Sequence, residues 1–354
     1  MKTKINIIKS IDEDITYLRE ASQIIKEGGI VAFPTETVYG LGANALNEEA
    51  VKKIFIAKGR PQDNPLIIHV SDKDISDYVT NISDIANKLI EKFWPGPLTI
   101  ILNKKDIVPN VTSANLESIG IRMPSNDIAL KLIELSGTPI AAPSANISGR
   151  PSPTEVERCI EDLDGKVDYI LGGNRSDVGV ESTIIDCTVN PPLVLRPGGI
   201  TLEMLREIDP RIDMDKAIMK KPTEDLRPKA PGMKYRHYAP KAKVHIIKGE
   251  NEKVLKKMDE MIKNYLKDGK KVGVLSSQNN FSYYNSVEVI NLGSNLNEVA
   301  KNLFEALRSL DDKKVDVILS EAFEEKGVGI AVMNRLNKAA GYSIINVEEE
   351  SKWK

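Results

Sequence analysis

Apolar residues recur at helical spacing in the first part of the chain and alternate there with short apolar runs. Residues 11–27 carry a helical stripe that ends at Gly28-Gly29, and residues 30–33 form an apolar run directly after it. A stripe that stops at glycine predicts a helix, and a short apolar run bounded by turn residues predicts a buried strand. The pattern predicts helices at 11–27, 48–57, 83–93, 127–136 and from 153, and strands at 30–33, 67–70, 98–102, 119–122, 139–142, 169–171, 183–186 and 192–196. Because the strands are short and their connections vary, we expect an α/β domain around a twisted mixed sheet.

The pattern becomes more regular from residue 244 onward. It predicts strands at 244–247, 271–275, 287–290, 315–319 and 343–347, and helices at 251–267, 295–310 and 329–339. Strands that alternate with helices in this way are typical of a smaller, Rossmann-like parallel sheet. No G-x-G-x-x-G follows its first strand, so dinucleotide binding is not indicated.

Residues 210–243 separate these two regions and have few periodic apolar positions. They contain five prolines and hold 10 Lys or Arg against 4 Asp or Glu. Long segments without regular structure are usually functional or disordered. We therefore expect a domain at 1–209, a basic linker or lid at 210–243 and an accessory domain at 244–354.

Composition and charge narrow the class of protein. The 354 residues are enough for about two domains, and the longest apolar runs fall short of the roughly 20 residues of a membrane span. The two cysteines, Cys159 and Cys187, lack metal-type spacing, and the N-terminus lacks the apolar core of a secretory signal, so we expect a cytosolic protein. Residues 1–208 hold 22 Lys or Arg against 29 Asp or Glu, which argues against a general nucleic-acid footprint.

Cations beside glycine or proline are the strongest candidates for chemistry. Lys58-Gly59-Arg60-Pro61 follows a predicted helix, and phosphate binds well to an ammonium beside a guanidinium. The alternative is an ordinary helix stop, in which glycine and proline follow the last turn. Further cations, at the ends of predicted strands or in a loop of small residues, are Arg122, Arg150 and Arg196. Together they favour a site for an anionic small molecule, although a lone arginine on a strand more often forms a structural ion pair.

Several catalytic motifs are absent from the sequence. There is no G-x-x-x-x-G-K-[ST] loop, no G-x-S-x-G elbow and no H-E-x-x-H, and the three histidines form no Ser/His/Asp or Cys/His pattern. A covalent acyl-enzyme is therefore not indicated, and no residue is identified as a direct metal ligand. Positioning and charge neutralisation remain, as in phosphoryl- and nucleotidyl-transfer sites.

Seven segments, in their order along the chain, resemble one known family. They are Pro34-Thr35-Glu36-Thr37-Val38-Tyr39-Gly40-Leu41, Lys58-x-Arg60 with Asn64-Pro65-Leu66, Trp94-Pro95-Gly96-Pro97-Leu98-Thr99, Ala142-Pro143-Ser144-Ala145-Asn146, Glu181-Ser182-Thr183, Leu195-Arg196-Pro197-Gly198 and the linker run 231–240. Together they resemble the YrdC-type threonylcarbamoyl-AMP synthases in their two-domain form, and the likeness spans nearly the whole chain.

The resemblance implies a reaction of L-threonine, bicarbonate and ATP to threonylcarbamoyl-adenylate and pyrophosphate, for threonylcarbamoyladenosine modification of ANN-decoding tRNA. It implies threonine contacts from Thr35, His69, Arg122, Ala142 and Ser182. It implies ATP contacts from Lys58, Arg60, Asn64, Ser118, Ser144, Arg150 and Arg196, with Mg²⁺ accompanying the nucleotide. It implies a lid that includes Tyr235, Arg236 and His237.

The implied partners are a separate threonylcarbamoyl transferase complex and, as a further candidate, the tRNA itself, with no membrane. A non-catalytic RNA-binding module of the same fold is the main alternative. Carbamoyl transfer in hydrogenase maturation is disfavoured, because two isolated cysteines cannot build the zinc modules of that class.

Overall fold

The computed structural model describes residues 2–220, 228, 230, 231 and 237–350, without the side chains of 349 and 350. The chain divides into two compact units. The first comprises Met1–Ser148 and Ser152–Tyr235, and the second comprises Gly149–Pro151 and Arg236–Lys354. Three residues of a loop in the N-terminal half therefore belong to the C-terminal unit.

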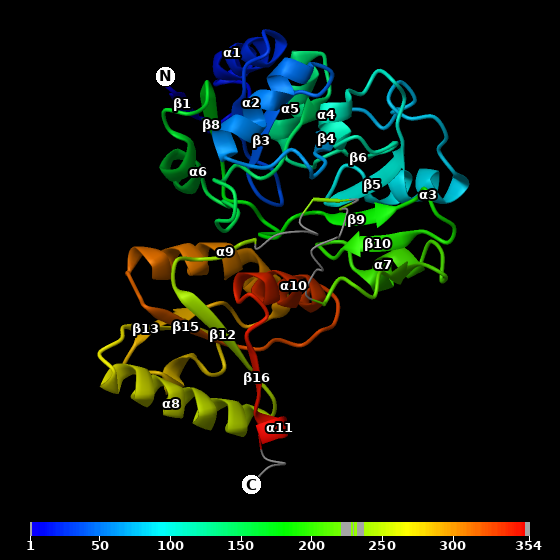
Figure 1. Ribbon diagram of the computed structural model, residues 1–354. Coiled ribbons are helices and arrows are strands. Elements are labelled where there is room, and N and C mark those ends of the chain that lie inside the picture. Colours follow the sequence, from blue (N-terminus) through cyan, green and yellow to red (C-terminus); the bar gives the residue numbers. More distant parts are fainter. Residues whose placement is uncertain (1, 221–227, 229, 232–236, 351–354) are drawn as a thin grey trace. The chain divides into compact units, whose positions relative to one another are not determined.

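An eleven-stranded mixed sheet forms the centre of the first unit (Figure 1). Its strands are β1 (Lys4–Ile7), β2 (Val31–Phe33), β3 (Gly40–Asn44), β4 (Ile67–His69), β5 (Leu98–Asn103), β6 (Ser118–Arg122), β7 (Ile140–Ala141), β8 (Tyr169–Gly172), β9 (Thr183–Asp186), β10 (Leu193–Arg196) and β11 (Asp213–Met214). They lie in the order β1-β8-β2-β3-β7-β4-β6-β5-β9-β10-β11, with parallel and antiparallel neighbours. The prediction of a mixed α/β sheet is confirmed.

Helices connect these strands, and most of them begin at a residue whose side chain accepts a hydrogen bond from a backbone amide of the first turn. They are α1 (Ile15–Lys26), α2 (Glu48–Lys58), α3 (Asp84–Phe93), α4 (Asn110–Ser113), α5 (Asp127–Ser136), α6 (Val156–Leu163) and α7 (Leu202–Arg206). Asn47, Ser83 and Asn126 accept backbone hydrogen bonds at the starts of α2, α3 and α5. Such caps satisfy amide groups that have no partner within the helix.

Alternating side chains of the sheet contribute to two separate apolar cores. In β2, Val31 and Phe33 pack with residues of α1 and α5, whereas Ala32 packs with residues of α2 on the other side. This is the two-residue period of a strand covered on both faces. Because both faces of the sheet are covered, the strand ends and the loops are the places where polar side chains can gather.

The second unit is a five-stranded sheet in which every recorded strand pair is parallel. Its strands are β12 (Lys243–Lys248), β13 (Val272–Ser276), β14 (Glu288–Asn291), β15 (Val317–Glu321) and β16 (Ile344–Asn346), in the order β14-β13-β15-β12-β16. Its helices are α8 (Asn251–Lys267), the 3₁₀ turn η1 (Phe281–Tyr283), α9 (Leu296–Asp312), α10 (Gly329–Ala339) and α11 (Val347–Glu350). Within this unit α8 covers one face of the sheet, and α9 and α10 cover the other (Figure 1). The Rossmann-like prediction is confirmed.

Three strands of the first unit were not predicted from the pattern. They are β1, β3 and β11. The polar start of the chain obscures β1, while β3 is the glycine-rich run Gly40–Asn44 and β11 is a two-residue strand within 210–243. Separately, no helix among the described residues is long and apolar enough to cross a membrane.

Candidate active site

The ends of three neighbouring strands bring polar side chains of the first unit together. His69, at the end of β4, is the register partner of Arg122, at the end of β6, and of Ile140 in β7. Ala142, just after β7, donates its backbone N–H to the carbonyl of Ile67. Because adjacent ladders fix these positions, the His69 and Arg122 backbones are neighbours by construction of the sheet, while Ala142 lies beside Ile67, two residues before His69 in β4.

Arg122 is the buried cation of this group, with only 4% of its surface exposed. Its Nη1 donates to Thr37 Oγ1 at 2.9 Å and its Nε to the carbonyl of Gly96 at 3.3 Å. Its Nη2 lies 2.7 Å from Glu36 Oε1. The ion pair that is common for a strand arginine is therefore present, and it holds the guanidinium in one orientation.

Thr35 and Thr37 form the turn that carries Glu36. Their hydroxyl oxygens are 2.9 Å apart, and Thr35 Oγ1 also donates to the carbonyl of Val38 at 2.6 Å. Backbone amides of Thr37 and Val38 point back to Thr35 Oγ1. Such local side-chain to backbone bonds stabilise a turn where helix or sheet ladders are missing.

His69 is buried among these groups and is neutral at physiological pH. Burial, and then the nearby positive charge of Arg122, lower the pKa of His69 from 6.5 to about 3. Both effects disfavour the charged imidazolium. The ring can therefore take part in polar contacts without adding charge to the site.

Ser182 and Arg196 form the next part of the site, at the ends of β9 and β10. Arg196 donates from Nε to the Ser182 carbonyl and from Nη2 to Ser182 Oγ, each at 3.0 Å. The Ser182 hydroxyl is also 2.8 Å from Thr99 Oγ1 in β5. The β9–β10 register shifts between Val194 and Arg196, so that Val194 pairs with Ile185 and Arg196 with Ile184. Such an irregularity changes the direction of a side chain at the end of a strand.

Lys58 ends α2 and is almost fully buried, with 2% of its surface exposed. Its Nζ donates to the carbonyls of Ser144 and Asn146, while Ser144 Oγ donates to Asn146 Oδ1. Gly59 follows in the left-handed conformation, with φ of 59°. The helix stop and the buried cation are therefore both present at this position, and neither interpretation of the sequence excludes the other.

Arg60 lies just beyond this helix end. Its Nη2 donates to the carbonyls of Asn64 at 3.1 Å and Pro65 at 3.3 Å, and its guanidinium carbon is 5.7 Å from the centre of the Phe55 ring. Asn64 is buried, with 2% exposed. The loop between the two residues is thus closed by its own arginine.

Ser118, at the start of β6, lines a narrow cavity of about 10 Å³ with Pro65, Thr99, Gly120 and Pro231 among its walls. That volume is about one water molecule. The neighbouring Ala230 is fully buried and packs in a small apolar cluster with Ile67, Ile101, Ile184 and Leu195. Arg196 Nη1 donates to the Pro231 carbonyl at 3.3 Å. Two linker residues thus fill the space beside Ser118 and Arg196.

Comparisons with known proteins match both units. Residues 23–198 match the Sua5–YciO–YrdC family model, described as "Telomere recombination", and residues 200–341 match the model described as "Threonylcarbamoyl-AMP synthase, C-terminal domain". A threonylcarbamoyl-AMP synthase of Pyrococcus abyssi is 52% identical over 344 residues, which are 97% of this chain and 99% of the relative. The chain belongs to the threonylcarbamoyl-AMP synthase family.

Two further members agree with this assignment. The threonylcarbamoyl-AMP synthase of Bacillus subtilis is 44% identical over 352 residues, covering 98% of this chain and all of the relative. The crystal structure of Pyrococcus abyssi Sua5 complexed with L-threonine has a TM-score of 0.91 and 49% identity, and the match covers 98% of this chain and 99% of that one. The likeness to the synthase family therefore extends over both units.

Eleven of the residues that the synthase family resemblance names lie in the first unit. They are Thr35, Lys58, Arg60, Asn64, His69, Ser118, Arg122, Ala142, Ser144, Ser182 and Arg196. Arg150 belongs to the second unit, and Tyr235 and Arg236 lie outside the described residues. His237 is described, and its ring is tilted against that of Tyr238 with centroids 5.6 Å apart.

Four residues that contact the predicted site residues were given no role from the sequence. They are Glu36, Gly96, Thr99 and Asn146. Each lies within one of the family motifs quoted above. Membership in such a motif was therefore the sequence signal that could have identified these residues. Their contacts depend on segments far apart in the chain, such as the Arg122 bond to Gly96 and the Lys58 bond to Asn146.

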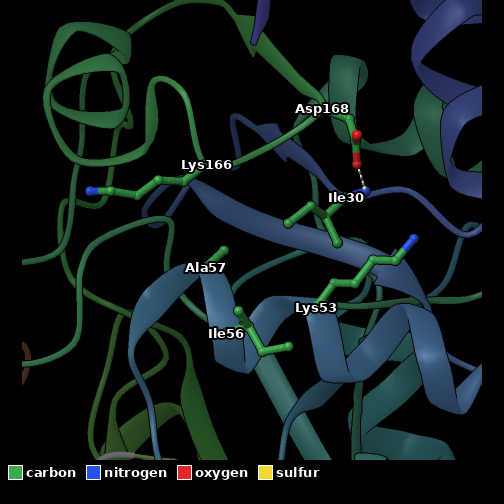
Figure 2. Close-up of a pocket in the computed structure, with 6 residues that line it drawn as sticks. All are labelled: Ile30, Lys53, Ile56, Ala57, Lys166 and Asp168. Atoms are coloured by element: carbon green, nitrogen blue, oxygen red, sulfur yellow. Dashed lines mark hydrogen bonds between the residues drawn. The ribbon is translucent and has the colours of Figure 1, made fainter. Parts of the chain in front are cut away.

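A larger pocket of about 540 Å³ lies elsewhere on the first unit and is lined by Ile30, Lys53, Ile56, Ala57, Lys166 and Asp168 (Figure 2). Asp168 accepts a hydrogen bond from the Ile30 amide at 2.8 Å, and the lysines donate to backbone carbonyls. The two lysine side chains reach away in opposite directions (Figure 2). None of the residues assigned by the synthase resemblance lines it.

Proposed function

We infer that this protein is a threonylcarbamoyl-AMP synthase, a nucleotidyltransferase of tRNA modification. It joins L-threonine, bicarbonate and ATP to give threonylcarbamoyl-adenylate and pyrophosphate. The observation that carries the conclusion is the match to a synthase of the same name over 97% of this chain and 99% of that relative. The product is used for threonylcarbamoyladenosine in ANN-decoding tRNA.

We propose that L-threonine binds between Thr35, His69, Arg122, Ala142 and Ser182. Arg122 suits the α-carboxylate, because a guanidinium can form two parallel hydrogen bonds to it. Neutral His69 adds a polar contact without charge, and the small side chain of Ala142 leaves room for the threonine side chain. Bound L-threonine in the Pyrococcus abyssi crystal structure supports the amino acid as ligand.

We propose that ATP binds along Lys58, Arg60, Asn64, Ser118, Ser144, Arg150 and Arg196. Lys58 would turn from the carbonyls of Ser144 and Asn146 to the phosphates, where its charge offsets the charge of the leaving pyrophosphate. The described residues contain no group of three or more His, Cys, Asp or Glu that could hold a metal ion. Mg²⁺ is therefore proposed to arrive with the nucleotide as part of the substrate.

The chemistry needs no nucleophile from the protein. Threonine and bicarbonate form the carbamate, a carbamate oxygen attacks the α-phosphorus, and the bond to pyrophosphate breaks. The protein positions the reactants and supplies fixed positive charge, which is how phosphoryl-transfer sites accelerate reaction. Buried Arg122 and Lys58 are suited to this role, since their geometry is already held by neighbouring groups.

We propose that residues 210–243 act as a lid over the nucleotide. A carbamate and a mixed anhydride both hydrolyse in an open site, so a cover that excludes water has a physical purpose. The contacts of Ala230 and Pro231 beside Ser118 and Arg196 support this, because they involve the proposed nucleotide residues. Hydrogen exchange of full-length protein should show ATP slowing exchange within 210–243, and unchanged exchange would argue against a lid.

The remaining expectations extend the same proposal. We propose the domain limits 1–209, 210–243 and 244–354, and a cytosolic location. A separate threonylcarbamoyl transferase complex would receive the product, and tRNA is a further candidate partner. The two partners follow from the synthase reaction, whose product is an activated intermediate that another protein must use.

Pyrophosphate release from purified protein tests the function directly. Release should require ATP, L-threonine and bicarbonate together, and omission of any one should abolish it. RNA binding without any such release would favour the non-catalytic RNA-binding module instead. Hydrolysis of ATP that ignores threonine would contradict the proposed synthase.

A further inference from the structure

Four polar atoms of three neighbouring residues are buried without a hydrogen bond among the described residues. They are Glu36 Oε1 and Oε2, His69 Nδ1 and Arg122 Nη2. Buried polar atoms in folded proteins nearly always have partners, and an unsatisfied one costs about 1–3 kcal/mol. Glu36 Oε1 and Arg122 Nη2 form an ion pair with each other, so Glu36 Oε2 and His69 Nδ1 are the two atoms here that a polar ligand would complete.

Arg122 is the residue that joins the other two. Its Nη2 lies 2.7 Å from Glu36 Oε1, although the contact lacks the alignment of a hydrogen bond. Its charge also acts on the neighbouring His69 ring. Nε and Nη1 are held by Gly96 and Thr37, so Nη2 is the part of the guanidinium that meets Glu36.

Glu36 is itself buried, with 8% of its surface exposed, and Oε2 has no ionic or hydrogen-bonding partner among the described residues. A carboxylate removed from water needs compensating donors. One misaligned contact with Arg122 supplies only part of them. The Oε2 atom of Glu36 is therefore placed to accept a hydrogen bond from a cationic or N–H donor beside the guanidinium.

An α-amino acid matches this pair of opposite charges. Its carboxylate and its ammonium are attached to the same carbon, as the guanidinium of Arg122 and the carboxylate of Glu36 are side by side here. The competing explanation is that Glu36 only neutralises Arg122 as a structural ion pair. The two explanations differ in whether Glu36 distinguishes a ligand that carries an amino group from one that does not.

We propose that Glu36 binds the α-ammonium group of L-threonine while Arg122 binds its carboxylate, and that Glu36 then accepts the proton the amine must lose. The proposal rests on the proposed synthase function. In the step, threonine ammonium, bicarbonate and the Glu36 carboxylate give threonine carbamate, water and the protonated Glu36 carboxyl group. The N–C bond forms and a C–O bond of bicarbonate breaks; of the two protons that the nitrogen loses, one moves to Glu36 and the other joins the departing hydroxide to form water.

Calorimetric titration of full-length protein tests this with two ligands, L-threonine and (R)-3-hydroxybutyrate, which lacks only the amino group. Wild type should bind threonine more tightly than the analogue. Glu36→Gln keeps the size and polarity of the side chain but removes its charge. It should weaken threonine binding about ten- to a hundredfold, the range of a charged hydrogen bond, and leave the analogue nearly unchanged.

Each other result contradicts the proposal. Equal loss of both ligands in Glu36→Gln would make Glu36 a structural counter-ion of Arg122. Unchanged threonine binding would show that Glu36 does not contact the ammonium group. If the variant did not fold, wild type alone would decide, because equal binding of threonine and the analogue would exclude an ammonium contact.

Two further variants complete the design. Asp186→Asn removes another buried carboxylate of the first unit, one that accepts hydrogen bonds from Thr188 at the far end of β9, and it should leave the preference for threonine intact. Glu36→Asp retains the charge and should recover part of both threonine affinity and kcat. Failure of the synthase function itself would look different, since wild type would then release no threonine-dependent pyrophosphate.

Discussion

Arg308 donates two hydrogen bonds to the carbonyl oxygen of Pro151, from Nε at 3.1 Å and from Nη2 at 2.7 Å. Both residues belong to the second unit. The Ala239 amide donates to the Gly149 carbonyl at 2.9 Å, and Tyr238 stacks on Phe304 with ring centroids 5.0 Å apart. Helix α9 therefore holds both the end of the linker and the tripeptide that carries Arg150.

Removal of the Arg308 guanidinium should destabilise the second unit. Arg308→Ala leaves the buried Pro151 carbonyl without its two donors, which costs about 1.5–3 kcal/mol for charged hydrogen bonds. Scanning calorimetry should show a lower unfolding temperature. Lys263→Ala on the exposed face of α8 is the control and should leave that temperature unchanged. An equally stable Arg308→Ala would show that the clamp contributes nothing.

Arg122→Lys should affect the affinities for the two ligands of the proposed site differently. A lysine ammonium cannot reproduce the three directions in which Arg122 contacts Thr37, Gly96 and Glu36. Threonine affinity should fall by about 1.5–3 kcal/mol with ATP affinity nearly kept, as measured by titration of each ligand. Equal loss of both would mean that Arg122 maintains the structure instead.

Lys58→Met should abolish most pyrophosphate release. Loss of a fixed charge at a site of developing negative charge typically lowers kcat about a hundredfold or more. Threonine binding should remain, because the residues proposed to bind L-threonine lie outside helix α2, which carries Lys58. Lys53→Met is the matched control, since Lys53 lies on the same helix and its Nζ also donates to a backbone carbonyl, that of Gly28 at 2.7 Å. Similar losses in both variants would exclude a specific role for Lys58.

His69 should make stability depend on pH in the acid range. Its pKa is about 3 when folded and about 6.5 when unfolded, so the unfolded chain binds more protons between these values. The contribution of His69 to stability is therefore complete above pH 6.5 and is lost as pH falls toward 3. Urea unfolding at pH 7 and pH 4.5 should show a smaller decrease for His69→Gln than for wild type. The same decrease in both would exclude His69 as a cause.

Gly198→Ala should disturb the strand end at Ser182. A Cβ at Gly198 would lie 2.3 Å from the Thr183 nitrogen and 2.6 Å from the Glu181 carbonyl oxygen, both of them backbone atoms. Threonine affinity and unfolding temperature should both fall. Gly137→Ala, at the end of α5 with φ of 59°, has nothing within 4 Å of the new Cβ and should cost only about 1 kcal/mol. Normal threonine binding in Gly198→Ala would contradict the crowding argument.

The pattern of apolar residues predicted most of the elements, because long stripes and apolar runs reflect burial directly. The boundaries of α5, α8 and α10 agree with the predicted ranges to the residue. Strand β3 escaped prediction, since Gly40 and Gly42 have little strand propensity and Phe33 packs close to both of them. Strand β1 becomes a strand only through pairing with β8, more than 160 residues later.

The motifs named candidate site residues, but not how these residues would pair in the folded chain. Lys58 and Arg60 were expected to face an anion, and in the structure they donate to backbone carbonyls. Glu36 stood inside a recognised motif with no assigned role, although it is the carboxylate beside Arg122. Such pairings depend on turn and strand geometry that no local pattern encodes.

The inward position of Lys58 has a consequence for the resting protein. With 2% of its surface exposed and two carbonyl oxygens around its nitrogen, this ammonium offers little attraction to stray polyanions. A compound at the proposed nucleotide site would reach this charge only by displacing both carbonyls, which demands the correct shape as well as negative charge. Selectivity at this position thus begins before any ligand arrives.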